Sequence, residues 1–254
     1  MKQQSLVLTL AYNGSAYAGF AKQKDPCLCT IQGELERALA TYFRHPVETV
    51  CAGRTDAGVH ALGQVVSCVL DETDFDGVTP GRLTISLNAL TPDDIVIKAV
   101  DFARPEFSAR FDATTREYRY RIVTGPVPPL FLSDFAWWRR GELDIEAMRQ
   151  GVAHLIGEHD FKSFCKAASA EGKTTMRRVD EISITHEEQM GRAACSSRSS
   201  ATPFYTRWCA PSSARSCRWE LGIANLAGSP TCSRHAIAAR QARRLRLAAS
   251  PSGM

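Results

Sequence analysis

The chain lacks any long uninterrupted hydrophobic run. None of its apolar stretches approaches the roughly 18 residues that a membrane-spanning helix needs. The N-terminus also lacks a basic region followed by an apolar core and a cleavage site, so we expect no signal peptide. These two absences predict a cytoplasmic protein that has no membrane partner.

Metal-ligand spacings are absent as well. The nine cysteines are scattered, and Cys27 and Cys29 are too close together for a zinc knuckle, with no second pair to complement them. His154 and His159 are five positions apart, which does not suit two ligands on one helical face. An odd number of cysteines without a secretory signal is typical of reduced cytosolic thiols. We therefore expect no metal site.

Charge of one sign is scarce at the C-terminal end. Residues 1–191 carry 21 Lys and Arg against 26 Asp and Glu, whereas residues 192–254 carry ten Arg, no Lys and one acid, Glu220. The overall charge of +4 therefore hides a mildly acidic main part and a basic end. Affinity for nucleic acid in the main part must come from local clusters of arginine.

The hydrophobic pattern up to about residue 190 indicates a mixed α+β protein. The expected strands are 6–12, 47–51, 64–69, 95–100, 115–123 and 178–184, and the expected helices lie at 31–43, 80–87 and 145–155. The first six elements follow the order β-α-β-β-α-β of a ferredoxin-like split unit. We predict two ferredoxin-like, RRM-like α+β units that face a central cleft, with domains at 1–103 and 104–191.

One predicted loop contains an acid, an arginine and a histidine close together in the sequence. The octapeptide Gly53–His60 follows an apolar run, and glycines on both sides of Asp56 allow the backbone to turn sharply there. Arg54 and His60 are near enough in sequence to share a surface with this acid. An ionised carboxylate that is held in place can act as nucleophile or general base. Taken alone, the same residues also fit an ordinary polar turn.

The whole octapeptide resembles the signature of the TruA-type tRNA pseudouridine synthases. Further blocks of the same family match in the same order, and the resemblance runs from about residue 6 to residue 185. These blocks are 11–20, 30–36, 107–113, 116–120 and 155–164. The resemblance implies an isomerase that converts uridine to pseudouridine in the anticodon stem-loop of tRNA, as a homodimer and without a cofactor.

The resemblance also implies roles for individual residues. Asp56 matches the catalytic aspartate, and Tyr118 matches the tyrosine that stacks on the target base. Arg54 is the residue expected to enter the RNA helix beside the extruded nucleotide, or else it only pairs with Asp56. Arg110 and Arg119 are expected phosphate contacts, together with Arg116 and Arg121. His60 either supports the loop or touches RNA.

The chain changes character from about Arg192. Residues 192–254 are rich in Ala, Ser and Arg and lose hydrophobic periodicity, which predicts a poorly ordered tail and leaves the second unit without its closing elements. A second hypothesis is translation out of frame. Shifting Phe204–Ala210 by two bases turns the Trp208-Cys209 junction into a valine codon and permits Phe-Leu-Tyr-Gln-Met-Val-Arg, which resembles the family's C-terminal helix motif.

That hypothesis has a chemical consequence. In the family, an arginine of this helix motif pairs with the catalytic aspartate, and no arginine of the chain as written matches its position. Three interpretations of function therefore remain at this stage. They are an active tRNA pseudouridine synthase, a catalytically defective RNA-binding remnant of the same family, and a non-catalytic ferredoxin-like RNA-binding module.

Overall fold

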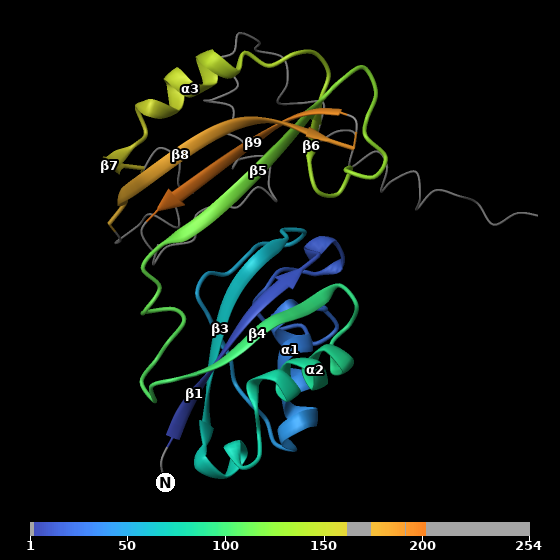
Figure 1. Ribbon diagram of the computed structural model, residues 1–254, viewed down its shortest axis with the longest axis vertical. Coiled ribbons are helices and arrows are strands. Elements are labelled where there is room, and N and C mark those ends of the chain that lie inside the picture. The colour runs from blue at the N-terminus through green and yellow to red at the C-terminus, as the bar shows by residue number, and fades with distance from the viewer. Residues whose placement is uncertain (1–2, 162–173, 191, 202–254) are drawn as a thin grey trace, which may run out of the picture. The chain divides into compact units, whose positions relative to one another are not determined.

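The computed structural model describes residues 3–161, 174–190 and 192–201, and within them the chain forms two compact units (Figure 1). Residues 3–117 belong to the first unit, and the described residues between 118 and 199 belong to the second. The protein is therefore of the predicted α+β class, with a sheet in each unit. Residues 104–117, which the sequence assigned to the second domain, group with the first unit.

The first unit is a four-stranded antiparallel sheet with two helices. Its strand order is β2-β3-β1-β4, which is the arrangement of the predicted β-α-β-β-α-β unit. The elements are β1 (Gln3–Tyr12), α1 (Ile31–Phe43), β2 (Val50–Cys51), β3 (Ala61–Asp71), α2 (Pro80–Leu90) and β4 (Ile95–Ala103). Two short 3-10 helices, η1 (Gly14–Ala16) and η2 (Glu72–Phe75), lie between them.

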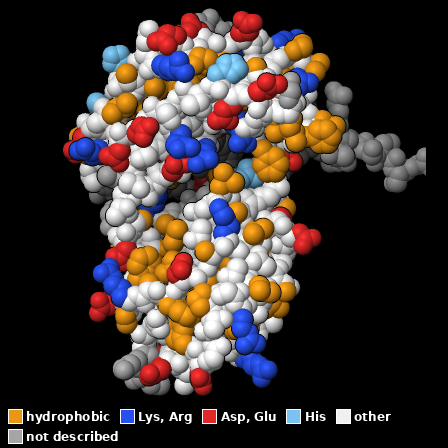
Figure 2. Space-filling view, in the orientation of Figure 1, with side chains coloured by type: hydrophobic (Ala, Val, Ile, Leu, Met, Phe, Trp, Pro, Cys, Tyr) orange, Lys and Arg blue, Asp and Glu red, His pale blue; other side chains and the backbone are white. Residues whose placement is uncertain are grey.

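Alternation along β1 builds the core of this unit. Leu6, Leu8 and Leu10 point to one face of the sheet and are fully buried, together with Leu35 of α1 and Leu87 of α2. Burying a leucine side chain contributes about 1.5–3 kcal/mol, so this alternation anchors the whole unit. The residues of β1 between these leucines, Val7 and Thr9, are β-branched. Apolar side chains are also visible on the surface of this unit in Figure 2.

The two helices of the first unit begin in different ways. The Thr30 hydroxyl accepts a hydrogen bond from Gly33 N at the start of α1, and Arg44 ends the helix in the left-handed conformation with φ of 63°. Helix α2 begins at Pro80, whose missing N–H costs nothing at this position. Asn88 of α2 pairs with both the N–H and the carbonyl of Ile97, which satisfies part of the outer edge of β4.

The second unit is a five-stranded sheet of order β6-β5-β9-β8-β7. Its elements are β5 (Arg116–Thr124), β6 (Trp137–Arg139), α3 (Ile145–Ala153), β7 (Gly157–Asp160), β8 (Met176–Gln189) and β9 (Arg192–Ala201). Helix α3 buries Met148 and Val152, and Arg149 donates a hydrogen bond of 3.1 Å to the Ile184 carbonyl of β8. Within the described ranges, no helix has the length and apolar character that a membrane span requires.

The prediction of a poorly ordered tail from about Arg192 is wrong for its first residues, because Arg192–Ala201 form strand β9. It lies between β5 and β8, so its backbone pairs on both sides. The sheet of the second unit, which was expected to stay incomplete, therefore contains this strand near its centre. Small side chains suffice in this position, because Ala194, Cys195 and Ala201 are buried without any large hydrophobic residue. The rest of the predicted tail, residues 202–254, lies outside the described residues.

Candidate active site

Asp56 lies in the connection between β2 and β3, where the sequence placed it. Its backbone forms an isolated antiparallel bridge with Gly19, and the neighbouring Thr55 carbonyl accepts a hydrogen bond of 2.9 Å from Phe20 N. The loop is therefore paired along its length with the segment that follows β1. A carboxylate on such a paired backbone has less freedom to move than one on an open turn.

Two glycines make this pairing possible. A Cβ atom on Gly14 would lie 1.9 Å from the Val59 carbonyl oxygen, and one on Gly19 would lie 3.0 Å from the Thr55 carbonyl oxygen. Gly19 also has φ of +116°, a conformation that other residues rarely adopt. Only glycine lets these two backbone segments approach each other this closely.

The loop reverses direction immediately after Asp56. Val59 N donates a hydrogen bond of 3.2 Å to the Asp56 carbonyl, and Gly58 has φ of 79°. A positive φ at the third residue is typical of a type II turn, which requires glycine there. Asp56 is thus the first residue of the turn, and its side chain is partly exposed.

Buried side chains hold the backbone on the other side of Asp56. The Tyr12 hydroxyl lies 2.8 Å from the Thr55 hydroxyl, and Gln64 Nε2 lies 3.5 Å from the Tyr12 hydroxyl. The same Gln64 nitrogen also donates to the Gly53 carbonyl. Gln64 lies inside β3, three residues after the strand begins at Ala61. Tyr12 belongs to a family motif, but nothing in the sequence indicated a contact across 43 positions.

His60 supports the loop, as one of the two sequence-based hypotheses stated. Its Nδ1 accepts a hydrogen bond of 3.3 Å from Gly14 N. In this contact the ring nitrogen is the acceptor and the backbone N–H of Gly14 is the donor. Contact of His60 with RNA stays a prediction.

The charges of three arginines act on the thiol of Cys51, at the end of β2. Burial raises the pKa of this thiol, and the positive charges of Arg54, Arg116 and Arg110 partly oppose that rise. The Arg116 guanidinium also donates to the Ala52 carbonyl, directly before the loop. The predicted residues Arg54 and Arg110 are therefore both near enough for their charges to affect the region of the Cys51 thiol, directly before the Asp56 loop.

The segment after β4 brings Arg110 to this region. Ala109 is buried, and its N–H donates a hydrogen bond of 2.9 Å to the Ser67 hydroxyl of β3. The Ser5 hydroxyl of β1 donates to the carbonyls of Pro105 and Phe107. The segment is thereby fastened across the sheet at several points. Arg110 itself is exposed, with its guanidinium 5.2 Å from the centre of the Phe111 ring.

Tyr118 and Arg119 lie on β5, in the second unit. Tyr118 is 41% exposed, so its ring does not belong to the hydrophobic core. Tyr120, two positions later, is partly buried, and the centre of its ring lies 6.4 Å from the centre of the Trp137 ring. Arg119 is exposed like Tyr118. Their contacts with substrate stay predictions.

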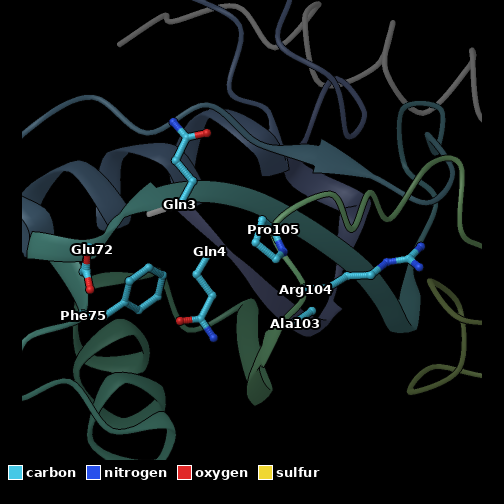
Figure 3. Close-up of a pocket in the computed structure, with 7 residues that line it drawn as sticks. All are labelled: Gln3, Gln4, Glu72, Phe75, Ala103, Arg104 and Pro105. Carbon is cyan, nitrogen blue, oxygen red and sulfur yellow. The ribbon is translucent and has the colours of Figure 1, made fainter. Parts of the chain in front are cut away.

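In the part of the chain that the structure describes, no group of three or more His, Cys, Asp or Glu side chains converges to hold an ion. A pocket of about 350 Å³ does occur in the first unit, lined by Gln3, Gln4, Glu72, Phe75, Ala103, Arg104 and Pro105 (Figure 3). It includes the first residue of β1, whereas the Asp56 loop contacts the last, so the pocket is separate from the loop.

Comparisons with known proteins show the family to which this chain is similar. A family model described as tRNA pseudouridine synthase matches residues 9–112 and 152–206, past the position at which the recognised motifs end. The "tRNA pseudouridine synthase A" of Fervidobacterium nodosum is 40% identical over 179 residues, 70% of each chain. That of Geobacter sulfurreducens is 40% identical over 188 residues, 74% of each chain. That of Shewanella sediminis is 38% identical over 182 residues, 72% of this chain and 67% of the relative.

Proposed function

Because this chain belongs to the tRNA pseudouridine synthase family, we propose that it isomerises uridine to pseudouridine in the anticodon stem-loop of tRNA. The observation that carries the proposal is the Asp56 loop itself. Its backbone is fixed by Gly19, Phe20 and Gly14, and its acid is partly exposed to solvent. The family match includes this whole arrangement, since it covers residues 9–112.

The proposed reaction rearranges the atoms of the substrate alone. The bond between ribose C1′ and uracil N1 breaks, the uracil turns, and a bond from C1′ to C5 forms. C5 loses its proton and N1 gains one, so no electron acceptor or donor is required. The chemistry that the protein must supply is an oriented carboxylate and a site for the detached base.

Asp56 supplies that carboxylate in our proposal. Three first steps are open to it: attack on ribose C1′, attack on uracil C6, or removal of a ribose proton. Tyr118 stacks on the uracil with its exposed ring, as aromatic side chains do with bases taken out of a helix. Arg54, which is exposed, enters the space that the extruded nucleotide leaves.

The remaining contacts bind the tRNA backbone. Arg110 is exposed on the segment after β4, and Arg119 is exposed on β5, so both are proposed to bind phosphates. His60, at the end of the Asp56 loop, is a further proposed contact with the RNA. We further propose that two chains form a homodimer and that the protein acts in the cytoplasm, where it meets tRNA.

Tritium release tests the proposed function. A tRNA transcript whose uridines carry tritium at C5 loses the label only where C5 becomes the glycosidic carbon. We expect the protein to release tritium from tRNA, and chemical mapping of pseudouridine to place the product in the anticodon stem-loop. A transcript without uridine in that stem-loop is the matched control and should release none. Absence of release from the intact tRNA would overturn the proposal.

A further inference from the structure

A buried hydrogen-bonded network flanks the Asp56 loop on the side of the sheet. It consists of Tyr12 at the end of β1, Gln64 on β3, the Thr55 side chain and the Gly53 carbonyl. Tyr12 is only 5% exposed and Gln64 only 9%. We call these four groups the Tyr12 network.

The network forms hydrogen bonds with the loop at the two residues on either side of Arg54. Gln64 holds the carbonyl of Gly53, and the Tyr12 hydroxyl holds the side chain of Thr55. Gln64 joins the two points through its contact with the Tyr12 hydroxyl at 3.5 Å. A chain that is fixed on both sides of one residue can turn only within narrow limits, and Asp56 is the next residue along it.

Packing fixes the Tyr12 ring independently of its hydroxyl. The ring lies in the hydrophobic core, 6.2 Å from the ring of Phe20, and Phe20 N bonds to the Thr55 carbonyl. The hydroxyl is therefore held rigidly at the end of β1, where a hydrogen bond has a fixed direction. Removing the hydroxyl alone leaves the apolar packing of this ring in place.

We infer that Tyr12 and Gln64 are positioning residues for catalysis, which act on Asp56 through Thr55 and Gly53. This inference rests on the proposed function, in which the Asp56 carboxylate must be aligned with a ribose or uracil carbon. Displacing a reacting group by about 1 Å can reduce a rate about a hundredfold. The network supplies orientation and does not contact the reacting atoms.

A double-mutant cycle tests the inference in the full-length protein. Tyr12→Phe and Thr55→Val each remove one side of the same hydrogen bond and keep the shape of the side chain. We expect each to lower kcat for tritium release about 10- to 100-fold, while the Kd for tRNA changes less than about twofold. Because both remove one interaction, the double variant should be no slower than the slower single variant.

Two further variants separate positioning from folding. Tyr42→Phe makes the same chemical change on α1, where Tyr42 packs against Phe43, and should leave kcat unchanged. Thr55→Ser keeps the hydroxyl and should restore most of the activity lost in Thr55→Val. The thermal midpoint of each variant shows whether the loss of rate follows loss of structure.

Three results would overturn the inference that Tyr12 and Gln64 position Asp56. A kcat of Tyr12→Phe equal to that of wild type, or a double variant in which the two losses multiply, would overturn the inference. A loss of rate that follows only the fall in thermal stability would overturn it as well. If the wild-type protein releases no tritium, the proposed function fails, and the inference fails with it.

Discussion

The backbones of Gly14 and Val59 approach each other so closely that a Cβ atom on Gly14 would come within 1.9 Å of the Val59 carbonyl oxygen. These residues lie 45 positions apart, on the segment after β1 and on the turn after Asp56. The same glycine donates its N–H to His60. One residue without a side chain thus holds the far end of the Asp56 loop by both shape and hydrogen bonding.

Gly14→Ala should therefore displace the loop. Overpacking typically costs about 1–3 kcal/mol, and here the obstacle is backbone, which cannot move aside as a side chain can. We expect a lower thermal midpoint and a larger fall in tritium release than the lost stability explains. Gly81→Ala on α2 is the matched control, since a Cβ there meets nothing within 4 Å. Equal activity of the two variants would refute the importance of this contact.

Arg110→Ala should weaken tRNA binding through charge. If Arg110 contacts one phosphate, its loss should lower the slope of log Kd against log salt concentration by about 1. The effect should not depend on the sequence around the target uridine, because phosphates carry no sequence information. Arg82→Ala removes an equal charge from α2 and serves as control. An unchanged salt slope for Arg110→Ala would show that Arg110 does not bind a phosphate.

The ion pair between His45 and Asp74 predicts a pH-dependent contribution to stability. Hydrogen bonding to Asp74 raises the pKa of His45 in the folded protein, with Nε2 lying 2.9 Å from Asp74 Oδ1. The contribution of this pair to folding stability is fully present below the pKa of His45 in the unfolded chain, about 6.5. It is lost as pH rises through the higher pKa of His45 in the folded protein.

Urea unfolding across this range measures the effect. Wild type should lose stability relative to His45→Gln as pH rises above about 6.5, because only wild type carries the titrating ring. The difference should be small, since the His45 side chain is 44% exposed and solvent screens the pair. Parallel pH profiles for the two proteins would contradict the predicted pKa shift.

The hypothesis of a shifted reading frame gives a prediction about the gene. Sequencing across codons 185–254 should reveal a single-base change that restores Phe-Leu-Tyr-Gln-Met-Val-Arg in place of Phe204–Ala210. The restored chain should then release tritium faster than the chain as written, because it regains the arginine of the family motif. A gene that retains the present frame, together with equal activity of both chains, would refute the hypothesis.

The sequence predicts most of the first unit, because its elements carry strong local signals. The alternation of Leu6, Leu8 and Leu10 and the turn at Asn13-Gly14 place β1, and the apolar face from Ile31 to Phe43 places α1. Strand β9 could not be predicted in this way. Its small residues give no hydrophobic periodicity, and it is a strand because β5 and β8 pair with it.

In the candidate site, too, local sequence motifs predict some residues, whereas contacts between distant residues could not be predicted. Asp56 is evident from its motif, and the turn glycine at position 58 behaves as its sequence context suggests. The contacts that hold the loop join it to Tyr12, Gly14 and Gly19, more than 30 positions away. Only the folded sheet brings these residues together, so no local pattern could reveal them.

The most direct test of the central claim is tritium release by Asp56→Asn, measured with excess enzyme in a single turnover. The change keeps the shape of the side chain and removes the charge of the carboxylate. Asp93→Asn, on an exposed aspartate after α2, is the matched control. We predict that Asp56→Asn releases no tritium above background yet binds tRNA within about tenfold of wild type, while Asp93→Asn behaves as wild type. Release by Asp56→Asn at the wild-type rate would show that this carboxylate does not carry out the reaction.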